Sequence, residues 1–200
     1  MNTFDTPPET NDVTALRDQL GEALAEIRSL RLRLDVLATL DMDTGLPNLN
    51  GIVDAIETAC VRQQRTGEPF GVVHVVFPGL DEAATRVGED AVGDAVRHLA
   101  ALLSAAVRGM DRVGRFDTTS FLVVAPQLDA AGVDPLVDRL VGVLTSMPVT
   151  VGNEVVDGEP VFSVVLSPAE AGGGADRLLT ALPDARALAR PSNPGVVTAP

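Results

Sequence analysis

Arginine and carboxylate side chains carry most of the chemistry that this sequence could perform. All 15 cationic residues are arginines, because the chain contains no lysine. A guanidinium group can fork to phosphate oxygens or to a guanine edge, and a carboxylate can accept hydrogen bonds from guanine. Arg108 and Asp111 bring both groups together three residues apart, and Arg186 and Arg190 stand four residues apart near the C-terminus. Such pairs also arise by chance, so their place in the fold must decide their meaning.

Other reactive side chains are scarce. Cys60 is the only cysteine and cannot form an internal disulfide, and one cysteine with two histidines is a poor set of zinc ligands. His74 lies within an apolar run, which favours a hydrogen-bonded core histidine over a catalytic one. We therefore expect no structural metal and no cofactor.

The negative net charge argues against two classes of binding partner, nucleic acids and anionic membranes. A formal net charge of −13 argues against nonspecific attraction to nucleic acid or to an anionic membrane surface, and a hydrophobic fraction of 46% indicates a globular protein. The apolar runs are far too short to span a membrane, and residues 1–12 do not resemble a secretion signal. We expect a cytoplasmic protein without membrane insertion, with disordered tails at 1–12 and 191–200.

Residues 13–40 have the spacing of a coiled coil. Apolar residues recur in alternating steps of three and four, namely Val13, Leu16, Leu20, Ala23, Ile27, Leu30, Leu34 and Leu37. A helix over this segment would extend roughly 42 Å, which is long for an internal helix. The pattern predicts a homodimer through residues 13–40, and the alternative is that the helix packs on its own domain.

From residue 41 onward, helical and strand patterns alternate. Helices are predicted at 48–64, over a longer stretch that follows the first strand and runs to about Val107 with a break near Gly88, and at 131–146 and 176–189. Strands are predicted at 70–77, 111–116, 121–125, 149–156 and 160–166, and the first is apolar enough for a central strand covered on both faces. The pattern predicts one domain over 41–190, of the α/β (α+β) class, with a mixed, partly antiparallel central sheet flanked by helices.

The segment from Asp41 to Asn48, with the sequence DMDTGLPN, resembles the opening D-x-L-T-G-L-P-N of GGDEF domains, the catalytic modules of diguanylate cyclases. Gly93 and Asp94 also stand where that family has a Gly-Asp pair at the start of a helix. A preceding coiled coil is typical of the family. The resemblance covers about residues 41–190 and implies a fold like that of the nucleotidyl cyclases.

The catalytic positions implied by this resemblance are degenerate. The name-giving motif would follow Arg115 and Phe116, where the chain has Asp117, Thr118, Thr119, Ser120 and Phe121. The family places metal-binding carboxylates at the fourth letter of the motif and at the end of the central strand, which correspond here to Ser120 and Phe77. Joining two GTP molecules needs a divalent ion to hold phosphate oxygens. The resemblance with these substitutions predicts a domain without cyclase activity.

Other positions keep the residue types with which the family binds its ligands. Arg108 and Asp111 have the R-x-x-D form and the spacing from the hairpin of the inhibitory site where many cyclases bind cyclic di-GMP, and Arg139 lies where some members supply a second arginine. The alternative is that Arg108 and Asp111 only order the hairpin entrance. The family's nucleotide-binding Asn becomes Thr85, which leaves Asp94. Two further cations, Arg186 and Arg190, correspond to the family's phosphate-binding pair. Because they are four residues apart, they would lie on one face of a helix. The alternative is that both belong to a solvated helix end and bind no ligand.

The sequence therefore predicts an inactive GGDEF-like signalling domain that responds to cyclic di-GMP at Arg108, Asp111 and Arg139. The second interpretation is a dimerising scaffold that recognises an unidentified protein partner and no nucleotide. A GTP sensor using Asp94, Arg186 and Arg190, or a residual diguanylate cyclase, ranks below both.

Overall fold

The computed structural model describes residues 10–156, 158–168, 172–191 and 193–199, and only the backbone of residues 10–14, 32, 33, 35, 36 and 89. The chain divides into two units, 1–38 and 39–200. None of the helices in the described part combines the length and the hydrophobicity needed to cross a membrane.

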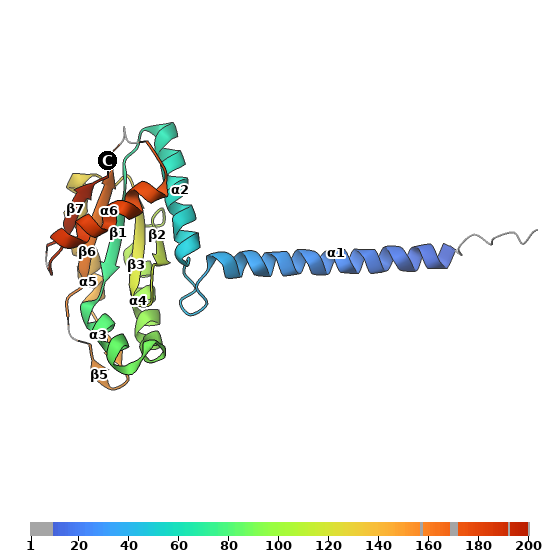
Figure 1. Ribbon diagram of the computed structural model, residues 1–200, viewed down its shortest axis with the longest axis horizontal. Coiled ribbons are helices and arrows are strands. Elements are labelled where there is room, and N and C mark those ends of the chain that lie inside the picture. The colour runs from blue at the N-terminus through green and yellow to red at the C-terminus, as the bar shows by residue number, and fades with distance from the viewer. Residues whose placement is uncertain (1–9, 157, 169–171, 192, 200) are drawn as a thin grey trace, which may run out of the picture. The chain divides into compact units, whose positions relative to one another are not determined.

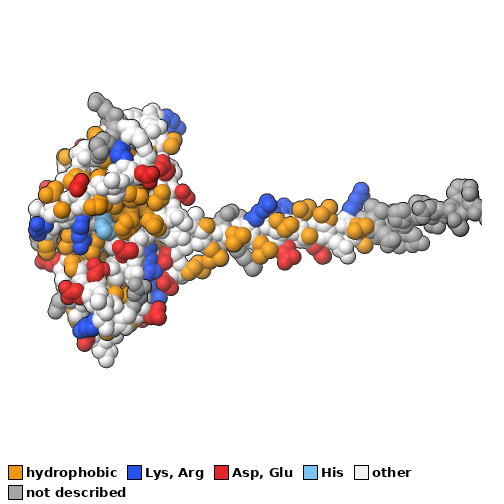
Figure 2. Space-filling view, viewed as in Figure 1, with side chains coloured by type: hydrophobic (Ala, Val, Ile, Leu, Met, Phe, Trp, Pro, Cys, Tyr) orange, Lys and Arg blue, Asp and Glu red, His pale blue; other side chains and the backbone are white. Residues whose placement is uncertain are grey.

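The first unit is one long helix, α1 (Thr10–Thr39), close to the predicted helix at 13–40. Its described apolar side chains at the three-and-four spacing are exposed in the single chain, as Figure 2 shows for the helix surface, with exposed fractions between 45% for Ile27 and 64% for Leu16 and Leu34. An isolated helix in water is stabilised mainly by packing its apolar face. The stripe on α1 therefore remains available for a partner.

The second unit is built on a five-stranded sheet with the order β2-β3-β1-β6-β7 (Figure 1). The strands are β1 (Phe70–Val76), β2 (Arg112–Arg115), β3 (Ser120–Pro126), β6 (Val161–Ser167) and β7 (Gly195–Thr198). All neighbours are antiparallel except β6 and β7, which are parallel. A separate small hairpin consists of β4 (Thr150–Val151) and β5 (Glu154–Val155).

Helices cover both faces of this sheet (Figure 1). One face packs against α3 (Pro78–Val87), the 3₁₀ turn η1 (Glu89–Val92), α4 (Gly93–Ala106) and α5 (Ala130–Leu144), and the other against α2 (Leu49–Thr66) and α6 (Ala175–Leu188). Along β1, Val73 and Val75 enter the first core while Phe70 and Val72 enter the second. The predicted central strand, covered on both faces, and the predicted mixed sheet are confirmed.

Local signals explain where α2 begins and ends. The Asn48 side chain accepts a hydrogen bond from the Gly51 amide at 3.1 Å and so caps the first turn. Gly67 closes the helix in the left-handed region with φ 69°, where glycine carries no steric penalty. The segment that resembles the family opening thus leads directly into this capped helix.

The predictions for both tails need correction. Residues 10–12 are helical, and residues 1–9 lie outside the described part of the chain. The C-terminal residues, predicted to be disordered from 191, contain β7 and belong to the second unit. A tight turn joins Arg190 and Asn193 through backbone hydrogen bonds of 3.0 and 3.1 Å, and the Ala199 amide donates to the Leu166 carbonyl at 2.9 Å. Pairing with β6 satisfies the backbone of this short segment, which sequence periodicity could not reveal.

Gly195 offers a test of this strand. A Cβ at position 195 would collide with the backbone of Ala185 and Ala189 at the end of α6. We expect Gly195→Ala to force β7 away from α6 and to lower the free energy of unfolding by about 1–3 kcal/mol. The measurement is denaturant unfolding, with hydrogen exchange of the Val197 amide as a local readout.

Gly142→Ala is the matched control, because a Cβ there meets no atom within 4 Å. Equal stability of the Gly195 and Gly142 variants would contradict the placement of β7.

Candidate functional site

The first part of the site lies where β1 ends. Phe77 follows this strand, is 5% exposed and packs in the core beside α3. Asp81, one turn further on, accepts a hydrogen bond from the Thr119 hydroxyl of the β2–β3 hairpin. The position that the resemblance assigns to a metal carboxylate is therefore part of the hydrophobic core and presents no oxygen donor.

The hairpin itself is closed by the side chain of Asp117. Its Oδ1 accepts from the backbone amides of Thr119 and Ser120 at 2.9 and 2.8 Å, and the Phe116 amide donates to the Ser120 carbonyl at 3.0 Å. An aspartate that bonds the backbone two and three residues ahead stabilises a tight turn. Asp117 thus has a structural role in closing the hairpin.

Ser120 faces inward and contacts a histidine. Its Oγ lies 3.0 Å from His74 Nε2, and the imidazole ring meets the Phe116 ring edge-on at 5.0 Å. Burial lowers the pKa of His74 to about 4, and the Arg186 cation adds to this while Asp117 and Asp81 oppose it. His74 is therefore a neutral, hydrogen-bonded residue near pH 7, as the sequence indicated.

These positions do not fit a divalent cation. Magnesium requires oxygen ligands, usually carboxylates, and the two corresponding positions hold a buried aromatic ring and a hydroxyl that is engaged with a histidine. Among the described residues, no group of three or more His, Cys, Asp or Glu side chains could hold a metal ion.

Beside the hairpin lies a shallow cavity of about 330 Å³. It is lined by Asp81, Ala84, Thr85, Asp117, Thr118 and Thr119. Two of these residues are carboxylates and none is cationic, so the lining repels a polyphosphate. The Thr85 hydroxyl donates to the Asp81 carbonyl within α3 at 2.9 Å.

Arg115 joins the hairpin to the turn at residues 41–47. Its Nη1 donates to Asp41 at 2.9 Å and to Asp43 at 3.1 Å, while Nε and Nη2 donate to the carbonyls of Asp117 and Thr118 at 3.1 and 3.0 Å. Partial burial would raise the pKa of Asp41, but hydrogen bonds from Thr44 and the charge of Arg115 hold it below its usual value.

The sequence placed both ends of this contact in recognisable motifs without pairing them. The signal that could have found the pair is the combination of an acidic turn with a lone arginine before a hairpin.

The structure places the remaining nucleotide positions on different elements, namely Asp94 on α4, Arg186 on α6 and Arg190 in the turn after α6. Asp94 pairs with Arg97 on the exposed start of α4. Arg190 donates to the carbonyls of Ala187 and Ala189 at 3.0 and 2.6 Å. Because α6 ends at Leu188, Arg190 lies beyond the helix, so the predicted shared face with Arg186 is wrong. The reason is the proline at 191, which disfavours helical geometry in the residue before it.

The R-x-x-D residues converge on a second cavity. Arg108, Asp111 and Arg139 line a pocket of about 170 Å³ between the end of α4 and α5. Asp111 is only 6% exposed, and its Oδ2 accepts from the Arg108 amide at 2.7 Å and lies 4.0 Å from Arg139 Nη2. Arg139 Nε donates to the Ala106 carbonyl at 2.7 Å. The pocket thus combines a fixed carboxylate with two guanidinium groups.

Comparison with known families identifies the family of this chain. The family model described as "Diguanylate cyclase, GGDEF domain" matches residues 38–180. The chain belongs to the GGDEF family. Among curated proteins, no sequence matches it.

Solved GGDEF structures share this fold. The coiled coil and GGDEF domain of DgcB from Caulobacter crescentus, in complex with c-di-GMP, is 18% identical with a TM-score of 0.67, covering 92% of this chain and 100% of that one. The diguanylate cyclase SiaD from Pseudomonas aeruginosa, in complex with its activator SiaC, is 21% identical with a TM-score of 0.65, covering 94% and 72%. A sensory box/GGDEF family protein from Caulobacter crescentus is 26% identical with a TM-score of 0.63, covering 74% and 94%.

His74 predicts a specific pH dependence for this GGDEF domain. Its folded pKa of about 4 lies below the unfolded value, so its stabilising effect is complete above about pH 6.5 and is lost as the pH falls toward 4. Between pH 7 and pH 5, we expect it to reduce the free energy of unfolding by about 2 kcal/mol.

The measurement is denaturant unfolding of the wild type and of His74→Gln at both pH values. The carboxylates contribute equally to both proteins, so the difference between them isolates the histidine. The same pH loss in both proteins would show that His74 is not neutral in the folded state.

Proposed function

We propose that this GGDEF domain does not synthesise cyclic di-GMP but binds it at Arg108, Asp111 and Arg139, as a cytoplasmic signalling module. The observation that carries the proposal is the pocket in which these three side chains meet. They come from two elements separated in sequence by the whole β2–β3 hairpin.

The chemistry of the pocket suits a guanine dinucleotide. In the proposed complex a guanine edge would donate to Asp111 Oδ1, because the Arg108 amide and Arg139 contact Oδ2. Arg108 is exposed and Arg139 is half-buried, so both guanidinium groups can reach a ligand at the pocket mouth. Forked hydrogen bonds from arginine to phosphate or to a purine edge are strong because they are charge-assisted.

The positions for catalysis argue against cyclase activity. A cyclase needs a divalent ion to hold phosphate oxygens and to help generate the attacking oxygen. Phe77 and Ser120 offer no carboxylate, and the cavity beside the hairpin has two acidic residues and no cation to balance a triphosphate. The DgcB structure with c-di-GMP is that of a relative in fold, and it supports the choice of ligand.

Titration calorimetry with cyclic di-GMP tests the proposal. We expect micromolar or tighter affinity, reduced about 10-fold to 100-fold in Arg108→Ala and in Arg139→Ala through the loss of charge-assisted hydrogen bonds. Arg65→Ala on α2 is the matched control and should bind like the wild type. No heat with folded protein would rule out this ligand.

The proposed lack of cyclase activity is tested with GTP as the substrate. Incubation with GTP and magnesium or manganese, followed by chromatography, should yield no cyclic di-GMP. Reproducible product would overturn the proposed inactivity.

A second candidate function is a dimeric interaction scaffold, favoured by the exposed apolar stripe on α1. The SiaD structure with its activator SiaC shows a protein partner for one relative in fold. Here α1 would pair with α1 of a second chain, and the paired helices would present the GGDEF domains to a partner.

Substitution on the stripe tests this pairing. We expect the wild type to be a dimer by light scattering and Ile27→Asp to be a monomer, because two buried carboxylates would face each other in the seam. Ala25→Asp adds the same charge outside the seam and should remain dimeric. A monomeric wild type, or a dimeric Ile27 variant, would contradict the pairing.

A further inference from the structure

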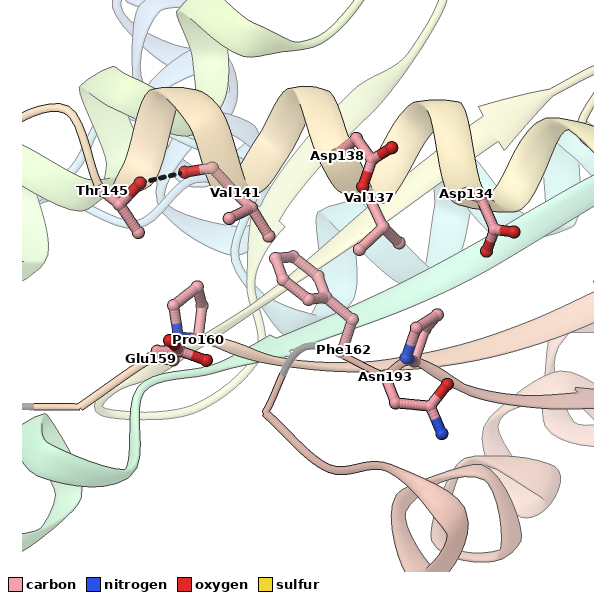
Figure 3. Close-up of a pocket in the computed structure, with 10 residues that line it drawn as sticks. Asp134, Val137, Asp138, Val141, Thr145, Glu159, Pro160, Phe162 and Asn193 are labelled. Carbon is pink, nitrogen blue, oxygen red and sulfur yellow. Dashed lines mark hydrogen bonds between the residues drawn. The ribbon is translucent and has the colours of Figure 1, made fainter.

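A groove of about 650 Å³ runs along α5 (Figure 3) and shares no lining residue with the R-x-x-D pocket. Its apolar lining consists of Val137, Val141, Pro160, Phe162 and Pro194. The Phe162 ring points from β6 toward α5, between Val137 and Val141 (Figure 3). This groove has a hydrophobic floor that continues the core of the domain.

The rim of the groove is acidic. Asp134 and Asp138 stand one turn apart on α5, and Glu159 lies on the opposite wall. All three side chains are exposed, and no arginine lines the groove. In the described part of the chain, Asp134 and Asp138 form no ion pair or hydrogen bond through their carboxylates. Asp134 and Asp138 therefore place two exposed negative charges beside the apolar lining of the groove.

The groove exists because the C-terminal segment folds back as a strand. Asn193 and Pro194, immediately before β7, form one end of it. Helix α5 packs against β6, whereas Val196 on β7 remains 37% exposed. The edge of the sheet thus extends past the helix that covers it, and the space between them stays open.

We propose that this groove docks a cationic amphipathic segment of a partner protein. Arginine or lysine side chains of the segment would meet the exposed Asp134 and Asp138, and its apolar side chains would contact the half-buried Val141 and Pro194. The volume is that of a site for a short segment of a few residues, since ligand pockets span about 300–1,000 Å³. Apolar anchors with a complementary charged rim are the usual anatomy of such an interface.

Charge complementarity selects this occupant over others. A second copy of the chain carries a formal net charge of −13 and would be repelled from an acidic rim. Nucleotides and other anions are disfavoured for the same reason. Neither the R-x-x-D pocket nor α1 contributes a residue to the groove. Peptide docking can therefore be tested independently of cyclic di-GMP binding.

Fluorescence anisotropy with labelled peptides tests the docking. The probe is a seven-residue peptide of alternating leucine and arginine, and the comparison peptides replace arginine with glutamate or leucine with glycine. We expect the full-length protein to bind the leucine–arginine peptide best, with affinity that weakens as salt rises. The double variant Asp134→Asn/Asp138→Asn should bind about threefold to tenfold more weakly, and Val141→Arg should abolish binding by filling the groove with a cation.

The matched control is Glu22→Gln/Glu26→Gln on α1, because an amphipathic peptide could also adhere to the apolar stripe there. This control should bind like the wild type, and circular dichroism checks that every variant is folded. Undetectable binding at millimolar peptide, equal binding to the Asp134/Asp138 variant, or equal binding of the glutamate peptide would each overturn the proposal. Self-association that survives Ile27→Asp and is lost in Val141→Arg would instead assign the groove to a second copy.

Discussion

The burial of β1 on both faces is the constraint on which the rest of this domain depends. Alternate residues of the strand enter two separate cores, so both helical layers are anchored to the same seven residues. A strand that is covered on both sides cannot carry charged groups without a large desolvation cost. The polar chemistry of the domain is therefore displaced to the strand ends, the hairpin and the helix flanks. His74 is the exception on β1, and its environment keeps it uncharged.

Polar contacts of its own side chains hold the β2–β3 hairpin in place. Arg115 connects it to the turn at residues 41–47, and Asp117 closes it through backbone amides. The Thr119 hydroxyl donates to Asp81, and the Ser120 hydroxyl is hydrogen-bonded to His74. The hairpin is thus held by contacts within the domain itself.

Helix α5 separates two surfaces of opposite character. One flank contributes Arg139 to a pocket with cationic groups, and the other contributes Asp134 and Asp138 to an acidic groove. Residues a turn apart share a helix face, whereas neighbours in sequence point in different directions. A single helix can therefore contribute an arginine to one cavity and two aspartates to another.

The sequence by itself determined the family, the order of most elements and the central strand, because these depend on local signals. A short stretch of sequence is enough to recognise each of these signals, namely the turn at residues 41–48, the apolar run at 70–77 and the three-and-four spacing of α1. Only the tertiary structure decided that the tail after Pro191 becomes β7, that Arg115 reaches Asp41, and that Arg190 lies outside α6. The physical reason is that these features arise from contacts between distant segments, whose energy comes from pairing and packing partners that no local pattern contains.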